Sequence, residues 1–281
     1  MFNSLKIILI GFFYLVFIYN STYSAQQITG EVGVKTTLRI CADPNNLPYS
    51  SQDTEGYENK IANLFAKKLG NIPVIYAWYP MTSGFVRRTL NAKTCDLIVT
   101  FPAIHEFVQN TNPFYNSSYV LMSLEEKDIK VKTLSDPKIK EKKYTIGIIH
   151  ATPPSSYVAK YKLFGQVKFY RQAADPRKQK PWVDITNDLV DGKLDIAILW
   201  GPYAGYEAKK AKKPIRIVPL TKEETVSRGK LVYRFTMGIR RNEPEWEKTI
   251  NNLIKENQEE INKILREYGV PLLDNLGNPL K

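Results

Sequence analysis

Two similar stretches of sequence decide the predicted fold: LNAKTCDLIVTFP at residues 90–102 and LVDGKLDIAILWGP at residues 189–202. In each stretch an aspartate stands directly before an apolar run, and a proline follows soon after it. A short apolar run bounded by turn residues is typical of a strand buried on both faces of a parallel sheet. Because the pattern occurs twice, the sequence predicts two copies of one α/β unit.

Extended and helical patterns alternate around each of these stretches. In the first half the order is strand, helix, strand, helix, strand, at residues 37–42, 57–69, 73–79, 84–91 and 96–100. Gly70 is placed to end the first helix, and Ser83 is placed to cap the second. The second half repeats the order at residues 143–149, 155–164, 167–170, 183–190 and 195–200. This alternation predicts an α/β fold with two doubly wound lobes.

The last third of the chain is expected to close the structure. Residues 215–219 and 231–239 are extended, and residues 245–255 and 258–268 have the spacing of amphipathic helices. We expect the second extended segment to return to the first lobe, so that few strands join the lobes and a hinge can open them. The predicted lobes are residues 26–123 with 232–281, and residues 124–231.

The first residues have the pattern of a Sec-type signal peptide rather than of the fold. Lys6 precedes an unbroken apolar run at residues 7–18, which a polar stretch at residues 20–22 and the small residues Ser24 and Ala25 follow. The run is shorter than the roughly 20 residues of a membrane-spanning helix. Residues 1–25 are therefore predicted to direct export to the periplasm. Tyr23 at the −3 position leaves an uncleaved anchor as an alternative.

The chain carries a formal net charge of +12. A positive charge of this size favours acidic partners, anionic ligands or a membrane surface. The alternative is that the lysines only solvate the surface, and their wide distribution favours this interpretation. No nucleic-acid-binding motif is present, so a nucleic-acid partner is not predicted.

Cys41 and Cys95 are the two cysteines. In an oxidising compartment an even pair suggests a disulfide. Both residues fall at strands that are expected to be parallel neighbours, where an offset could exceed the Cα–Cα distance that a disulfide allows. Two buried thiols are therefore the alternative.

No motif of catalysis or metal binding occurs in the sequence. His105 and His150 are far apart and lack ligand-spaced neighbours, so neither a metal site, a cofactor nor an enzyme is predicted. In open parallel sheets, ligands bind at the carboxyl ends of the strands. The candidate cleft residues at these ends are Asp43, Asn45, Asn46, Tyr49, Pro102, His150, Trp200, Gly201 and Tyr203. Trp200 and Tyr203 are equally compatible with core packing.

Four stretches together resemble one known family: TLRICADPNNLPYS, GYENKIANLFAKKLG, WYP…GFVRRTLNAKTCDLIV and AILWGPYAGYEAKKA. They are similar to the quinoprotein-dehydrogenase-associated solute-binding proteins of the MoxJ/XoxJ type, which are encoded beside PQQ-dependent methanol dehydrogenases. The resemblance runs from Leu38 to Leu272 and implies a type 2 periplasmic binding-protein fold. It further implies a periplasmic accessory factor that assists maturation or activation of methanol dehydrogenase by protein–protein contact. The dehydrogenase is the implied partner, and its cytochrome c is a second candidate.

The wider fold includes amino-acid-binding proteins, which hold the ligand between an arginine and an aspartate. The arginine would follow the DLIVT strand and the aspartate the DIAILW strand, but these positions read FPAIHE (residues 101–106) and WGP (residues 200–202). A buried zwitterion without both partners would carry a large desolvation cost. We therefore predict that ordinary amino acids do not bind. The alternative function is a transporter's receptor for another small molecule.

Overall fold

Ten strands form one hydrogen-bonded sheet in the order β4, β1, β5, β12, β7, β10, β8, β9, with β11 paired to β7 and β6 to β12. The computed structural model describes residues 35–103, 106–173, 178–224 and 226–280, so the predicted signal peptide lies outside the described residues. The strands are β1 (Leu38–Ala42), β4 (Val74–Trp78), β5 (Leu97–Pro102), β6 (Gln109–Asn110), β7 (Tyr115–Leu124), β8 (Ile146–Ile149), β9 (Val167–Tyr170), β10 (Ile196–Trp200), β11 (Ile215–Pro219) and β12 (Val232–Ile239). A separate ribbon is formed by β2 (Asn45–Asn46) and β3 (Ser50–Ser51).

Eight α-helices accompany the sheet in the described part of the chain. They are α1 (Tyr57–Lys68), α2 (Phe85–Arg88), α3 (Pro137–Glu141), α4 (Pro154–Lys160), α5 (Pro181–Val190), α6 (Gly201–Lys210), α7 (Pro244–Glu256) and α8 (Gln258–Glu267). Two short 3-10 turns, η1 (Glu125–Lys127) and η2 (Phe164–Gln166), lie between them. None of these helices has the length and apolar composition that crossing a bilayer requires.

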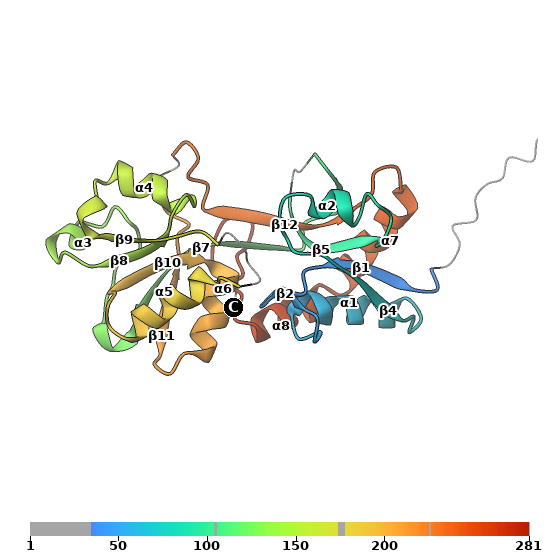
Figure 1. The fold of residues 1–281 in the computed structure, drawn as a ribbon, viewed down its shortest axis with the longest axis horizontal. Coiled ribbons are helices and arrows are strands. Elements are labelled where there is room, and N and C mark those ends of the chain that lie inside the picture. The colour runs from blue at the N-terminus through green and yellow to red at the C-terminus, as the bar shows by residue number, and fades with distance from the viewer. Residues whose placement is uncertain (1–34, 104–105, 174–177, 225, 281) are drawn as a thin grey trace, which may run out of the picture. The chain divides into compact units, whose positions relative to one another are not determined.

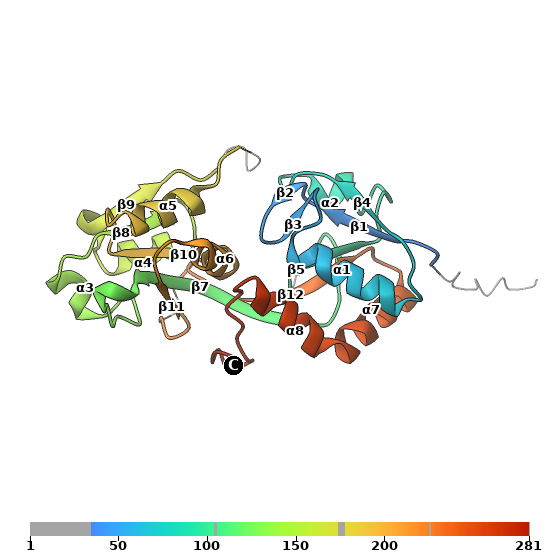
Figure 2. The same cartoon turned by 90° about the horizontal axis from the view of Figure 1, so that it is seen from below.

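Strand β7 divides the sheet into two halves. Its first residues, Tyr115 to Ser118, pair with β12, whereas its later residues pair with β10 and β11 (Figure 2). We call β4, β1, β5, β6 and β12 the first half-sheet, and β10, β8, β9 and β11 the second half-sheet. The predicted lobe boundary at residues 123 and 124 falls inside β7, and the lobe boundaries themselves stay a prediction.

Both faces of the first half-sheet are covered by helices, because successive side chains of a strand point to opposite faces. In β1, Leu38 and Ile40 pack against α1, α7 and α8, and both are fully buried. Cys41 points to the other face and packs beside Phe85 of α2. Figure 1 shows α1 and α8 on one side of β1 and β5, and α2 on the other.

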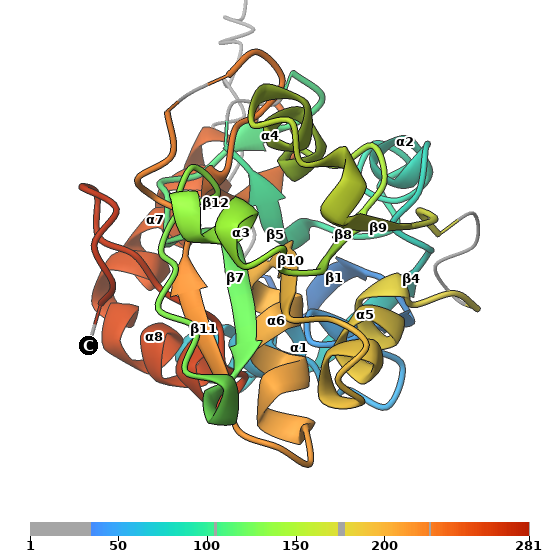
Figure 3. The same ribbon diagram turned by 90° about the vertical axis from the view of Figure 1, so that its left-hand side faces the viewer.

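The second half-sheet follows the same rule. Ile196 and Ile198 of β10 pack in a cluster with α3 and α4, whereas Ala197 and Leu199 pack against α5 and α6. Figure 3 shows α4 on one side of β7 and β10, with α5 and α6 on the other. The two doubly wound α/β units predicted from the repeated pattern are thus confirmed.

A charged cluster holds the start of β5 in place. The Asp96 side chain is buried and accepts hydrogen bonds from the guanidinium groups of Arg39, at 2.7 and 2.8 Å, and Arg240, at 2.6 Å. Lys35 lies 3.2 Å from the same carboxylate. Burial opposes ionisation, but these cations outweigh it and hold the pKa of Asp96 well below its usual range.

Several predicted elements differ in extent from the structure. The second helix of the first half shrinks from residues 84–91 to Phe85–Arg88. Gly84 adopts a left-handed φ of 93° and Ser83 makes no cap at its start, and Thr89 leaves helical geometry at its end, with φ −118° and ψ −81°. The sequence analysis did not assign β7 or α6. Most other strands and helices match the predicted ranges to within a few residues.

Candidate functional site

The structure brings together two sets of predicted cleft residues. The first set lies after β1, on and beside the β2–β3 ribbon: Asn45, Asn46 and Tyr49. The second set lies at the end of β10 and the start of α6: Trp200 and Tyr203. Both positions follow the carboxyl end of a strand, as the sequence analysis expected.

Two side-chain hydrogen bonds join the two sets, and a third reaches the first set from Lys180. The Trp200 indole N–H donates to the Tyr49 hydroxyl at 2.6 Å, and the Tyr203 hydroxyl donates to the Asn46 amide oxygen at 2.8 Å. The Lys180 ammonium, directly before α5, donates to the Asn45 amide oxygen at 3.0 Å. Polar atoms that could have faced a ligand are therefore occupied by other side chains of the same protein.

Aromatic rings fill the space around these hydrogen bonds. Tyr203 stacks on Trp182 of α5 with centroids 4.1 Å apart, and it meets Tyr49 edge-on at 5.5 Å. Trp200 meets Tyr119 and Tyr233 edge-on at 5.4 and 5.5 Å. Such arrangements stabilise a cluster beyond the burial of its area. The cluster is largely aromatic, with hydroxyl and amide groups as its polar atoms.

Asp43 is buried, and its side chain positions the neighbouring backbone. Its carboxylate is 2 % exposed and accepts the backbone N–H groups of Asn45, at 2.8 Å, and Met81, at 2.6 Å. The Ser50 hydroxyl bonds its backbone carbonyl at 2.9 Å. Asp43 therefore fixes the loop that presents Asn45 and Asn46, and its oxygens are already engaged.

Gly201 allows the start of α6 to approach the backbone of β7 closely. A Cβ atom at this position would lie 2.6 Å from the Ser118 carbonyl oxygen of β7 and 2.7 Å from the Pro271 ring. The absence of a side chain lets α6 begin directly against β7, which places Trp200 and Tyr203 beside the β2–β3 ribbon.

Pro102 and His150 are not joined to this cluster by any hydrogen bond or ring contact of the described residues. Pro102 is exposed at the end of β5, opposite Phe235 of β12. His150 is exposed after β8, with its ring edge-on to Phe169 at 5.7 Å. His105 lies outside the described residues.

Sequence reasoning missed a buried acid beneath the cluster. Glu58, in the first turn of α1, is 3 % exposed, and its Oε1 atom has no hydrogen-bond partner among the described residues. Burial raises the pKa of Glu58 to about 7. Next to it in sequence, the Tyr57 hydroxyl lies 3.2 Å from that of Tyr115. The only signal in the sequence was an acidic residue where a helix face turns inward.

Cys41 and Cys95 form a disulfide in the structure, with Cα atoms 5.3 Å apart. Cys95 lies before the first residue of β5, outside the hydrogen-bonded ladder. An offset along parallel strands could have prevented the disulfide. Because Cys95 lies in the loop before β5, this loop brings it close to Cys41.

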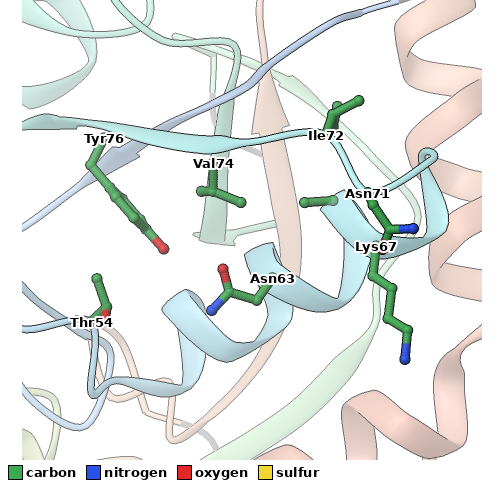
Figure 4. A pocket seen from close by; sticks show the side chains of 8 residues that line it. Thr54, Asn63, Lys67, Asn71, Ile72, Val74 and Tyr76 are labelled. Atoms are coloured by element: carbon green, nitrogen blue, oxygen red, sulfur yellow. The ribbon is translucent and has the colours of Figure 1, made fainter.

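Two cavities lie on the first half. One, of about 550 Å³, follows the ends of β4 and β5 and is lined by Met81, Phe85, Arg87, Phe101 and Phe107, among others. Another, of about 390 Å³, lies between α1 and the edge strand β4, where Asn63 and Tyr76 point into it (Figure 4). Across the described ranges, no group of three or more His, Cys, Asp and Glu could hold a metal ion.

Comparisons with known proteins agree with this geometry. Residues 38–271 match the family of bacterial extracellular solute-binding proteins, family 3. Protein MoxJ of Methylorubrum extorquens is 27 % identical over 84 % of this chain and 82 % of its own. The periplasmic binding protein XoxJ of Methylobacterium extorquens AM1 is 37 % identical, with a TM-score of 0.70, over 85 % of this chain and all of its own.

The fold is shared more widely. An ancestral cationic amino acid solute-binding protein has a TM-score of 0.63 at 19 % identity, over 83 % of this chain and 96 % of its own. At this identity the likeness concerns the fold alone. Together the matches confirm the expected type 2 periplasmic binding-protein fold and the MoxJ/XoxJ type.

Proposed function

The chain belongs to family 3 of the bacterial extracellular solute-binding proteins, and from this premise we propose that it is a periplasmic accessory factor of a PQQ-dependent methanol dehydrogenase. It acts by binding the dehydrogenase and assisting its maturation or activation, without catalysis of its own. The similarity to MoxJ and XoxJ supports this choice of partner.

One observation carries the proposal: the crevice of a binding protein is here bridged by its own aromatic and amide side chains. The bonds from Trp200 to Tyr49 and from Tyr203 to Asn46 lie at the strand ends where the sequence analysis expects the ligand cleft. Residues 101–106 contain no arginine, and residues 200–203 contain no acidic residue. The two charges that would grip a zwitterion are therefore missing from the sequence at both positions.

An aromatic cluster of this kind suits contact with a protein. Trp200, Tyr203 and Tyr49 are half-buried, so each ring keeps part of its surface accessible. Tryptophan and tyrosine are enriched among the residues that dominate protein–protein affinity. A dehydrogenase segment that displaced the bridging hydrogen bonds would meet a wide apolar surface with a few hydroxyl and amide groups.

The test is affinity purification of the tagged, full-length protein from a periplasmic extract of its own organism. Mass spectrometry of the eluate is expected to identify the methanol dehydrogenase subunits. Trp200→Ala is expected to reduce their recovery. Tyr203→Phe keeps the stacked ring and removes only the hydroxyl. It therefore tests the hydrogen bond from Tyr203 to Asn46 without disturbing the packing.

Leu276→Ala is the matched control, because Leu276 is 86 % exposed and lies outside the aromatic cluster. Its recovery of dehydrogenase should equal that of the unmodified protein. An eluate that contains a small metabolite and no dehydrogenase would contradict the proposal.

A second candidate function is supported by the cavity of about 550 Å³ at the ends of β4 and β5. Its volume lies in the range of small-molecule sites, and it combines apolar walls with the Arg87 guanidinium. This would suit the receptor of a transporter that carries an apolar anion. A ligand that raises the melting temperature, and an Arg87→Gln variant that abolishes the rise, would favour this function.

A further inference from the structure

The positive charge of the chain is concentrated in one part of the sequence. Residues 124–231 contain 23 Lys and Arg against 13 Asp and Glu, a net charge of +10. The remaining residues contain 17 against 15, a net charge of +2. Most of the net positive charge is therefore carried by the segment that builds the second half-sheet.

Within this segment, lysines gather at the edge of the sheet where β8 and β9 begin. A hollow of about 480 Å³ is lined there by Lys140, Lys143, Lys168, Thr145 and Gln166, among others. Strands β8, β9 and β10 are parallel, so this edge is the opposite one from the edge that carries Trp200. The hollow is thus separate from the aromatic cluster described above.

The lysines around the hollow differ in how they are paired. Lys168 lies 2.6 Å from Asp188, and that carboxylate is shared with Lys193 at 2.9 Å. In contrast, Lys140 and Lys143 are exposed and make no ion pair with any described residue. Lys138 and Lys142, on and after α3, are also exposed and likewise unpaired within the described ranges. An unpaired group of four lysines is available to a partner.

The backbone that presents these lysines is well held. The Asp136 carboxylate caps α3 by accepting the Lys138 N–H at 3.0 Å, and Ile139 between the lysines is fully buried. The Gln166 amide donates to the carbonyl oxygens of Ile139, at 2.7 Å, and Tyr144, at 3.1 Å. Short helix α3 is therefore fixed to the start of β9. A rigid support lowers the ordering cost of binding.

An exposed aromatic side chain lies beside the lysines. Phe164 of η2 is 62 % exposed, and it directly precedes Gly165, which lines the hollow. A large exposed apolar side chain next to a hollow lined by lysines matches the arrangement of an interface, with an aromatic anchor and a charged rim.

From these observations we infer that the start of β8 and β9, with α3 and Phe164, is a docking surface for an acidic protein segment. Acidic side chains of the partner would meet Lys140 and Lys143, and an apolar recess would receive the Phe164 ring. The hollow suits a protruding segment of a protein better than a flat bilayer. The inference deepens the proposed function and rests on it, because it assigns a second contact surface for the dehydrogenase, besides the aromatic cluster.

The experiment measures binding of the full-length protein to immobilised methanol dehydrogenase, purified from the same organism, at 50 and 300 mM NaCl. Lys140→Glu with Lys143→Glu is expected to weaken binding at least about tenfold at low salt, because opposite charges across the interface become like charges. Lys140→Gln with Lys143→Gln should cause a smaller loss and a weaker salt dependence. Phe164→Ala should weaken binding about tenfold at both salt concentrations.

Lys255→Glu with Lys263→Glu is the matched control, since both lysines are exposed on α7 and α8 and the change in charge is the same. It should change binding less than about twofold. Binding by the unmodified protein that the double charge reversal leaves intact would overturn the docking surface while sparing the proposed function. Absence of binding by the unmodified protein would overturn both. A reversal that abolishes binding to phosphatidylglycerol vesicles but not to the dehydrogenase would assign the surface to a membrane and overturn the inference.

Discussion

Replacing Glu58 by glutamine should remove the pH dependence of stability that this buried acid imposes. The pKa of Glu58 is raised from 4.5 to about 7 by burial, so the folded protein holds a proton that the unfolded chain releases. This contribution to stability is present below pH 4.5 and is lost as the pH rises to about 7. At about 1.4 kcal/mol for each tenfold change in proton concentration, the loss is about 3 kcal/mol.

The assay is urea unfolding of both proteins at several pH values between 4.5 and 8.5. Glutamine has nearly the same shape and stays neutral, so Glu58→Gln should gain about 3 kcal/mol relative to the unmodified protein across this range. Any constant packing cost of the amide cancels, because only the change with pH is compared. Glu259→Gln, at an exposed position of α8, should alter stability by less than about 0.5 kcal/mol. A difference between Glu58→Gln and the unmodified protein that does not vary with pH would refute the reasoning.

Three further variants test what holds the fold together. Cys41→Ala with Cys95→Ala should lower the free energy of unfolding by about 4 kcal/mol, since the disulfide closes a 54-residue loop in the unfolded chain, as urea unfolding without reductant would measure. Gly205→Ala should cost about 3 kcal/mol or prevent folding, because its Cβ would lie 1.7 Å from the Gly269 carbonyl oxygen; thermal melting measures the loss. Asp96→Asn should cost about 3 kcal/mol at neutral pH by leaving two guanidinium groups without their carboxylate. In unfolding experiments this loss should shrink as the pH falls below 3.8, where the stability given by the lowered pKa disappears.

Strong local patterns made most of the fold predictable from the sequence. The strand Leu38–Ala42 and the helix Tyr57–Lys68 match their predicted ranges because apolar spacing and Gly70 leave few alternatives. The repeated aspartate before an apolar run has a physical reason in both halves. Asp96 binds two guanidinium groups, and Asp195 accepts the Lys127 ammonium at 2.7 Å, so each anchors the start of a central strand.

Strand β7 was not predicted, because buried polar residues interrupt the apolar pattern by which a strand is recognised in a sequence. Ser117, Ser118 and Ser123 are fully buried in it, so the sequence shows no alternation and its only apolar run is the short stretch of residues 119–122. Long-range pairing with β12, β10 and β11 makes it a strand, and such pairing is not encoded locally. Helix α6 was missed for a related reason: its glycines, Gly201 and Gly205, lower helix propensity but are needed for close contacts with β7 and with Gly269.

The candidate site was only partly predictable. The rule that sites follow strand ends led to Asn46, Tyr49 and Trp200, which the structure joins, but equally to His150, which it leaves apart. That rule fixes an edge of a sheet, whereas contact between two edges depends on tertiary packing. Glu58 belongs to a helix rather than to a strand end, so the same rule could not reach it.

The bridging hydrogen bonds set a condition on any partner. If the two half-sheets part at a hinge, as the sequence analysis expects of the lobes, the bonds made by Trp200, Tyr203 and Lys180 break together. At about 0.5–1.5 kcal/mol each, they favour the bridged state by roughly 1.5–4.5 kcal/mol. A ligand shifts such an equilibrium only by its difference in affinity for the two states. A small solute that must first displace all three bonds would lose roughly 1.5–4.5 kcal/mol of its binding free energy, whereas a protein segment with a second contact at the lysine-rich edge could offset that cost. The bridge therefore selects for a large partner over a small one.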